Sequence, residues 1–248
     1  MQHLLPLVLA GLLAGTMNAV AGGGSFVTFP VMVLTGMPPV AANASSTVAL
    51  CPAIMASTWA YRDDLQGVAG ISLRLLLPLS LLGGMIGAVL LLVTPGEAFD
   101  LVIPWLLLLA TLTFAGGRHL GDWLRRYVRI GRGAFLFMQF ILSIYGGYFG
   151  GAIGLMMMAV WTLIDTAELK AMAAARTLLV GVTNGSAVLC FAAAGAVYWP
   201  ETLEMMVSAI AGGYYGARFA RHLPPVVLRW FVVLLSATVT VAFFLRKY

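Results

Sequence analysis

The chain has 248 residues, of which 61% are hydrophobic and only 9% are charged. A soluble domain carries about 25% charged residues, so these charges are too few to cover a water-exposed globule of this size. The composition argues against a soluble enzyme, a disordered chain and a disulfide-rich secreted scaffold. It is typical of a polytopic membrane protein, whose outer surface faces lipid.

The apolar segments are continuous rather than alternating, which predicts helices in a bundle. In chain order they lie near 4–21, 25–36, 43–61, 75–93 and 99–117, and then near 134–151, 153–164, 172–195, 203–217 and 230–245. No Lys or Arg precedes the first segment, which is therefore expected to be a retained helix and not a signal peptide. The predicted fold is an all-α polytopic membrane protein with about eight to ten membrane segments. Segments 25–36 and 153–164 are too short to span alone, and whether they cross or re-enter is left open.

The second five segments resemble the first five at a shift of about 130 residues. Gly22–Gly24 falls opposite a glycine-rich stretch that ends at Gly154, and Thr47 falls opposite Thr177. A Gly-Gly-x-x-Gly-Ala pattern also occurs in both halves, where it predicts small-residue helix packing. We predict a first transmembrane repeat, a basic cytoplasmic loop and a second transmembrane repeat over residues 1–117, 118–133 and 134–248.

The distribution of positive charge predicts how the halves are oriented. If each half crosses the membrane an odd number of times, nearly all Lys and Arg residues face one side, as the positive-inside rule favours. Broken or re-entrant helices in two inverted repeats are a recurrent transporter design. We therefore expect a multi-pass protein of the bacterial cytoplasmic (inner) membrane, with the basic loop 118–133 cytoplasmic and both termini periplasmic.

The glycine run Gly22, Gly23, Gly24 interrupts what would be one long helix, and Ser25 is expected to cap the short helix that follows. A helix N-terminus at membrane depth offers unpaired N–H groups and a partial positive charge, which attract an anion. Thr28 in the first turn and Gly154 in the other half join this candidate site. The alternative is a close helix crossing that needs small residues.

A second polar stretch is expected to open the third segment just after two prolines. Its candidate binding residues are Asn43, Ser45, Ser46 and Thr47. Four polar side chains in five positions exceed what one helix cap requires, which favours a polar cavity. The alternative is capping together with interhelical hydrogen bonds.

Arg176 is a charge within an apolar segment, where it costs about 2.5–3.5 kcal/mol on insertion scales. Asp165 and Glu168 lie nearer the edge of the segment. An unpaired guanidinium favours a bidentate anion such as sulfite, sulfonate or carboxylate. Thr177 and Asn184 are its expected neighbours in the site. The alternative is an arginine whose side chain extends to the membrane interface.

No pattern in the sequence predicts catalysis, a metal site or a cofactor. The carboxylates lie in loops or near segment ends, and the two cysteines are isolated in apolar segments. The net charge of +5 comes from arginines that flank the spans, which indicates membrane orientation and not nucleic-acid binding. The expected partners are a small anionic substrate and the lipid bilayer. The sequence leaves open whether the chain forms a homo-oligomer.

The glycine motifs and their surroundings resemble the sulfite exporter TauE/SafE family, also called the toluene sulfonate uptake permease family. The likeness covers nearly the whole chain and is carried by the stretches 15–30, 36–44, 145–154, 195–199 and 212–218. It implies a secondary transporter of sulfur-containing oxyanions or organosulfonates. The family pattern leads us to expect a lysine with an asparagine one turn beyond it, whereas this chain has Arg176 and then Asn184. The competing hypothesis is a non-transporting membrane scaffold or assembly protein.

Overall fold

The computed structural model describes residues 4–21, 23–68, 70–127, 130–163, 169–220 and 225–247. Within these ranges the chain is helical, apart from short turns and one isolated bridge between Val68 and Ile71. The predicted all-α membrane fold is confirmed. The helices are α1 (Leu4–Ala21), α2 (Ser25–Leu34), α3 (Pro39–Ala60), η1 (Arg62–Asp64), α4 (Leu73–Val93), α5 (Gly96–Tyr127), α6 (Arg132–Tyr148), α7 (Ile153–Trp161), α8 (Leu169–Ala193), α9 (Trp199–Ala220) and α10 (Pro225–Lys247).

The described surface is apolar and polar side chains lie inside, as lipid requires. The helices α3, α4, α5 and α8 each contain an apolar stretch long enough to cross a bilayer. Large side chains such as Leu82 and Val89 on α4 and Leu112 on α5 are exposed. Polar side chains such as Ser80 and Gln139 are fully buried between helices. Hydrogen bonds between helices then satisfy groups that lipid would leave unpaired.

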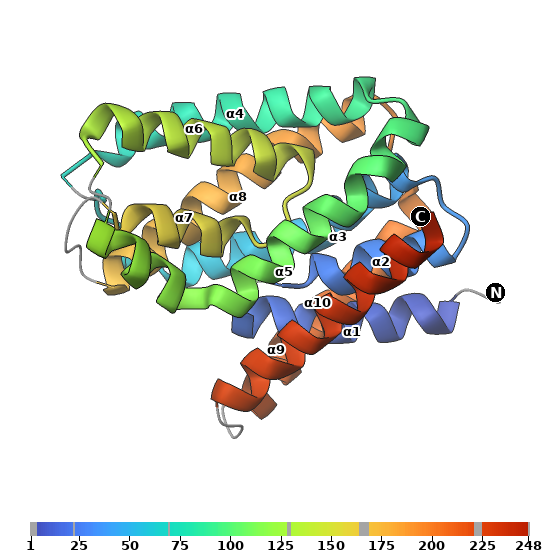
Figure 1. The fold of residues 1–248 in the computed structure, drawn as a ribbon. Coiled ribbons are helices and arrows are strands. Elements are labelled where there is room, and N and C mark those ends of the chain that lie inside the picture. Colours follow the sequence, from blue (N-terminus) through green and yellow to red (C-terminus); the bar gives the residue numbers. More distant parts are fainter. Residues whose placement is uncertain are drawn as a thin grey trace.

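The helices of the two sequence halves interlock (Figure 1). The helix α1 packs chiefly against α9, and α4 packs chiefly against α6. We match α1–α5 in order to α6–α10. The pair α1–α9 then corresponds to the pair α6–α4, and the pairs α3–α8 and α5–α10 each correspond to themselves. Glycines permit the close approach: a Cβ on Gly212 would overlap the carbonyl oxygen of Leu12, and a Cβ on Gly147 would overlap that of Gly84. The predicted small-residue packing is confirmed at these crossings.

The two short helices turn back instead of continuing across the molecule. The N–H of Ile130, just before α6, donates a hydrogen bond to the carbonyl of Leu163, just after α7, at 3.4 Å. Both outer ends of this hairpin therefore lie together, and Figure 1 shows α2 turning back against α1 in the same way. The indole of Trp161 anchors α7 by donating to Gln139 Oε1 at 2.9 Å. The tips of the two hairpins thus lie inside the bundle.

Two predicted boundaries are wrong. The helix α3 begins at Pro39, with proline at its first position, so the polar stretch from Asn43 lies inside the helix. The helix α5 continues to Tyr127, so most of the predicted loop 118–133 is helical. Leu, Arg and Trp in that stretch are compatible with helix, and the two glycines before it are not sufficient to end it.

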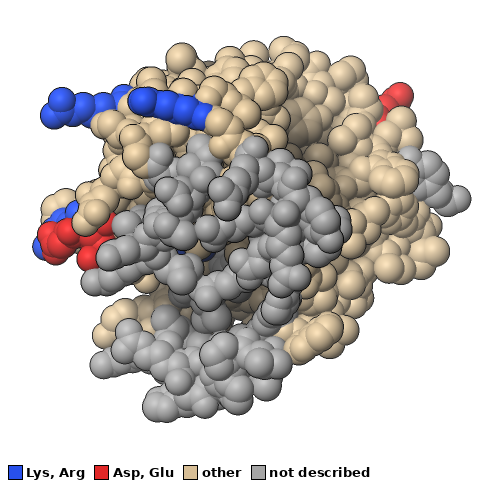
Figure 2. Space-filling model, turned by 60° about the vertical axis from the view of Figure 1, so that its left-hand side comes forward, with Lys and Arg blue, Asp and Glu red and all other residues tan. Residues whose placement is uncertain are grey.

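The described charged residues mark two ends of the molecule. The η1 end is the end at which η1 lies and at which α4 and α6 begin (left in Figure 1), and it carries Arg62, Arg74 and Arg132. At the opposite end α5 and α9 begin with Glu97 and Glu201 in their first turns. Figure 2 shows blue side chains at one edge of its face, with a red group beside them, and a separate red group at the other edge.

Candidate functional site

A cavity of about 130 Å³ lies where the two hairpin tips approach α3 and α8. Its walls come from the tip of α1 and α2, the tip of α6 and α7, and the facing sides of the two long helices. Of the residues predicted from the sequence, those that line it are Ser25, Thr47, Gly154, Arg176, Thr177 and Asn184. The structure therefore brings together residues from both halves that lie far apart in the chain.

Positions that match at the shift of about 130 residues line the cavity from opposite sides. The matching pairs are Ser25 and Leu155, Thr47 and Thr177, Leu50 and Val180, and Ile54 and Asn184. Residues at matching positions of the two halves are expected to line the same cavity only if the cavity lies on an axis that relates the halves. The side chains in the pairs differ, so the chemistry of the walls is unequal.

Arg176 supplies the only charge in the described lining of the cavity. It lies within the candidate span of α8, and no carboxylate among the described residues forms an ion pair with it. Asp165 and Glu168 fall outside the described residues. The arginine stem passes the tip of α7, where a Cβ on Gly154 would lie 3.2 Å from its Cδ. Glycine at this position leaves room for the arginine arm.

Asn184 lies deeper along the same face of α8 and is only 7% exposed. Its Oδ1 atom is buried and has no hydrogen-bond partner among the described residues. Beside it is the tip of the second hairpin, where Gly150 has a φ of 77° and Ala152 a φ of 59°. The left-handed turn permits the sharp reversal between α6 and α7.

The two threonines of the cavity already use their hydroxyl protons. Thr47 donates to the carbonyl of Asn43 and Thr177 donates to the carbonyl of Ala173, both at 2.9 Å. Each hydroxyl oxygen can still accept a hydrogen bond. Thr47 and Thr177 therefore offer hydroxyl acceptors to the cavity and no free hydroxyl proton.

The first glycine break serves close packing. A Cβ on Gly24 would lie 2.8 Å from the carbonyl oxygen of Ala14, and one on Gly23 would lie 3.0 Å from Phe114. Neither glycine lines the cavity, and Gly22 lies outside the described residues. Gly24, not Ser25, is the N-cap of α2, and no side chain caps this helix. The predicted capping role of Ser25 is wrong, because the helix begins at Ser25 itself.

Four other predicted residues lie outside the cavity lining and connect helices. Ser46 on α3 shares a hydrogen bond of 2.5 Å with Thr28 on α2. Asn43 donates to the carbonyl of Tyr148 at 2.9 Å, and Ser45 accepts the N–H of Tyr198 at 3.0 Å. The alternative hypothesis of interhelical hydrogen bonds holds for these residues, while the predicted capping does not, because α3 begins four residues earlier.

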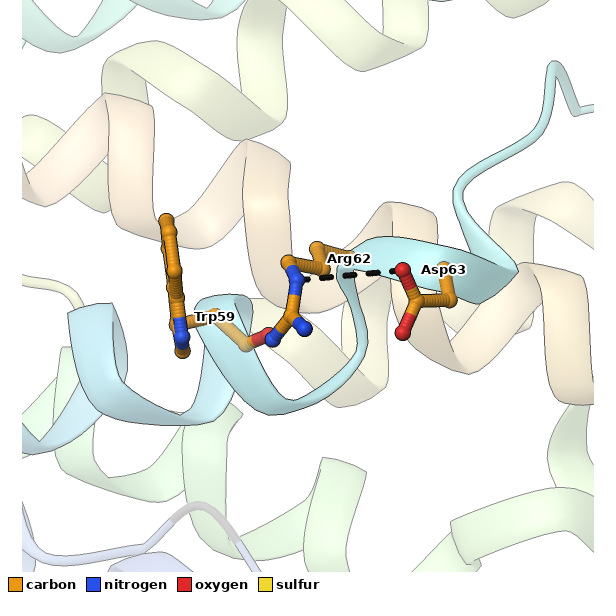
Figure 3. A network of polar contacts seen from close by, with 3 residues as sticks. All are labelled: Trp59, Arg62 and Asp63. Carbon is orange, nitrogen blue, oxygen red and sulfur yellow. Dashed lines mark hydrogen bonds and ion pairs between the residues drawn. The ribbon is translucent and has the colours of Figure 1, made fainter.

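Among the described residues, the cavity opens at the η1 end. Ser57 and Tyr61, near the end of α3, line it, and Tyr61 is 42% exposed. Beside this mouth the guanidinium of Arg62 stacks over the ring of Trp59 at 4.8 Å, and its Nε lies 3.7 Å from Asp63 Oδ1 (Figure 3). Sequence reasoning missed Ser57 and Tyr61, although both follow the polar stretch on α3 at helical spacing.

The cavity is closed toward the opposite end by aromatic rings. Phe149 lines the cavity, and its ring lies 5.9 Å from that of Phe29 in an edge-to-face contact. Phe29 contacts Phe99 and Phe243 in turn, with ring centroids 6.5 and 5.7 Å apart. We name Phe29, Phe99, Phe149 and Phe243 the aromatic plug. In the described part of the chain, these rings separate the cavity from the opposite end.

Helix hairpins that turn back, a cavity between the two halves and one cation in its wall define a class: helical membrane proteins built around an internal polar cavity. The chain belongs to the family described as sulfite exporter TauE/SafE, whose model matches residues 7–243. The resemblance predicted from the glycine motifs is confirmed.

Several curated proteins are similar to the chain over nearly their whole length. A "Probable membrane transporter protein ORF9" from Sinorhizobium sp. is 28% identical over 96% of this chain and 92% of its own. A "Probable membrane transporter protein" from Haemophilus influenzae is 29% identical, covering 93% and 90%. "Probable membrane transporter protein YfcA" from Escherichia coli K12 is 27% identical, covering 94% and 87%. No solved structure matches the chain.

Proposed function

We propose that this membrane transporter moves a small sulfur-containing oxyanion or organosulfonate across the cytoplasmic membrane as a secondary transporter. Family membership and the names of the relatives support the general function, transport across a membrane. The substrate class follows the family description and the chemistry of the cavity.

One observation carries the proposal: Arg176 faces an internal cavity and is not paired with a described carboxylate. A cation at membrane depth is unfavourable unless an anion accompanies it. The guanidinium fork suits sulfonate and sulfite, whose oxygens can accept two parallel hydrogen bonds. In this proposal the substrate supplies the negative charge that no described carboxylate provides.

The proposed mechanism uses residues 1–117 and 134–248 as inverted repeats joined by the basic segment 118–133. The helix α1 packs on α9 as its counterpart α6 packs on α4, and this correspondence supports the division. With the η1 end cytoplasmic, as the positive-inside rule predicts, the mouth at Tyr61 would face inward and the aromatic plug would face outward. Rocking of one half against the other would close the mouth at Tyr61 and open the plug.

Flux measurements in proteoliposomes test the proposal. The wild-type protein is expected to move sulfite or ethanesulfonate, and Arg176→Ala is expected to abolish the flux. Arg74→Ala is the matched control, because Arg74 is an exposed cation at the η1 end outside the cavity. Equal flux in a folded Arg176→Ala protein would contradict the role of Arg176, and wild-type protein that moves no anion would favour a scaffold.

A further inference from the structure

A second hollow lies on the exposed side of α8, between α3 and α4, both of which pack against this helix. It has a volume of about 460 Å³, and we name it the α8 groove. Met55 and Trp59 of α3 and Leu81 of α4 line it with exposed side chains. The surface is hollow because Gly181 and Gly185 of α8 carry no side chains. A Cβ on Gly185 would lie 3.7 Å from Met55 Cε, an ordinary contact, so a side chain there would occupy the groove.

The α8 groove is separate from the central cavity, and its surface is hydrocarbon. None of the described residues lines both spaces. The contact of α3 with α8 closes the wall between them, where the hydroxyl of Thr58 donates to the carbonyl of Thr177 at 3.2 Å. The hydroxyl of Ser186 donates to the carbonyl of Thr183 at 2.8 Å. Because both hydroxyls of the described lining already donate within the protein, the groove favours an alkyl chain over a polar ligand.

The α8 groove extends from the membrane surface through about one leaflet. The apolar candidate span of α3 ends at Trp59, whose side chain is 70% exposed, and tryptophan is typical of the membrane–water interface. Arg62 follows just beyond the span, at the level of the lipid headgroups. From Leu178 to Ser186 the lining covers about 12 Å of α8, close to half of the roughly 30 Å hydrocarbon core. These dimensions fit one acyl chain of a lipid in a single leaflet.

Arg62 supplies the only charge in the described lining of the α8 groove, and its side chain is 50% exposed. The guanidinium stacks over the ring of Trp59, and its Nη1 donates to the Trp59 carbonyl at 3.2 Å. Asp63 lies on the side of the guanidinium away from the indole (Figure 3). A guanidinium has more N–H donors than these contacts use, so donors remain for a phosphate oxygen. A cation with a carboxylate beside it matches a headgroup that carries both phosphate and ammonium.

We propose that the α8 groove binds one phospholipid of the bilayer whose headgroup ends in a primary ammonium, as in phosphatidylethanolamine. Its acyl chain lies over Gly181 and Gly185. Its phosphate accepts hydrogen bonds from Arg62, and its ammonium donates to Asp63. A headgroup with negative charge alone is less favourable, because Asp63 and Asp64 follow Arg62 and repel it. A quaternary ammonium keeps the charge but has no N–H to donate. This inference concerns a bound membrane lipid and is independent of the transported substrate.

Native mass spectrometry of the purified full-length protein tests the lipid assignment. Dioleoyl phosphatidylethanolamine, phosphatidylcholine and phosphatidylglycerol are titrated separately, so that only the headgroup differs. The first ethanolamine lipid is expected to bind about threefold more tightly than either of the others, as for an exposed ion pair. Equal affinities for the three lipids, or tighter binding of the glycerol lipid, would overturn the inference.

Variants at the η1 end test the headgroup contacts. Arg62→Ala is expected to weaken the binding of all three lipids about fivefold. Arg132→Ala is the matched control and should leave binding unchanged, because Arg132 is exposed at the same end outside the groove. The double variant Asp63→Asn, Asp64→Asn is expected to remove the preference for ethanolamine. A preference that survives in the double variant, or equal effects of the two arginine variants, would contradict the assignment.

Variants that fill the groove test the position of the acyl chain. Gly185→Leu is expected to weaken the binding of all three lipids about tenfold, which corresponds to roughly two methylenes no longer buried. Val182→Phe fills the same groove from a position that already has a side chain, and it serves where Gly185→Leu does not fold. Leu112→Phe, on the exposed face of α5, is the control. Undiminished binding in a folded filling variant would overturn the inference. A wild-type dimer that the filling variants abolish would assign the groove to a second copy and would overturn it equally.

Discussion

The two halves of the molecule build matching scaffolds and unequal chemistry. On α3, the position that matches Arg176 is Ser46, which is fully buried and bonded to Thr28. The position that matches Asn184 is Ile54, which presents only hydrocarbon. The first half thus contributes neutral side chains such as Ser25 and Thr47, and the second contributes the charge and the unsatisfied amide. In our proposal, matching backbone positions share geometry, while the residue that binds the anion comes from the second half alone.

The two halves also differ in exposure at matching positions of the long helices α3 and α8. Ser57 near the end of α3 lines the open mouth, whereas its counterpart Ala187 on α8 is fully buried. A symmetric state would expose both or neither. Under the proposed mechanism, the two positions would exchange these environments in the opposite conformation.

Cysteine labelling should show the largest contrast between the halves. In a background with Cys51→Ser and Cys190→Ser, a Ser57→Cys protein should react with a water-soluble thiol reagent. Ala187→Cys should react about a hundredfold more slowly, which corresponds to an opening free energy of about 3 kcal/mol. Rates are measured by mass spectrometry in proteoliposomes. Equal rates at the two positions would show that the cavity is not closed at the aromatic plug.

Alanine at the matching glycines of the hairpin tips should separate packing from binding. Gly24→Ala should destabilise the protein by about 1–3 kcal/mol, because the new Cβ would lie 2.8 Å from the Ala14 backbone carbonyl. Gly154→Ala should leave stability nearly unchanged, because its new Cβ would meet the flexible arm of Arg176 at 3.2 Å. It should weaken ethanesulfonate binding severalfold by displacing that arm. Thermal unfolding and binding titrations measure the two effects, and the opposite pattern would contradict the assignment.

Valine at the two threonines should give the smallest effect. Thr47→Val and Thr177→Val remove hydroxyls that already donate to Asn43 and Ala173. Neither hydroxyl proton is free for an anion, so each change should alter sulfonate affinity by less than about threefold. A loss of tenfold or more at one position would show that its hydroxyl turns toward the substrate and that the walls are less alike than the geometry indicates.

The sequence predicted the helical membrane fold and the membership of the family, because composition and glycine motifs carry both directly. It also identified Arg176, Thr177 and Asn184, since polar residues within an apolar helix are conspicuous. It did not distinguish Thr47, which lines the cavity, from Asn43, Ser45 and Ser46, which bond neighbouring helices. That distinction depends on the rotation of α3, which is set by packing against α2, α8 and α9.

The mouth at Tyr61 and the aromatic plug were not predictable from the sequence for a related reason. Phenylalanine and tyrosine occur throughout the apolar segments, and only the tertiary structure selects Phe29, Phe99 and Phe149 as neighbours. The turning back of α2 and α7 likewise depends on contacts such as Ile130 with Leu163, which join positions outside the short helices.

The central claim is that Arg176 binds an anion inside the bundle while its counterpart Ser46 does not. Calorimetric titration with ethanesulfonate tests it most directly, on wild type, Arg176→Gln and Ser46→Ala. We expect Arg176→Gln to lose about 1.5–3 kcal/mol of binding free energy, as for a charged hydrogen bond, and Ser46→Ala to keep wild-type affinity. Undiminished binding by a folded Arg176→Gln protein would contradict the account.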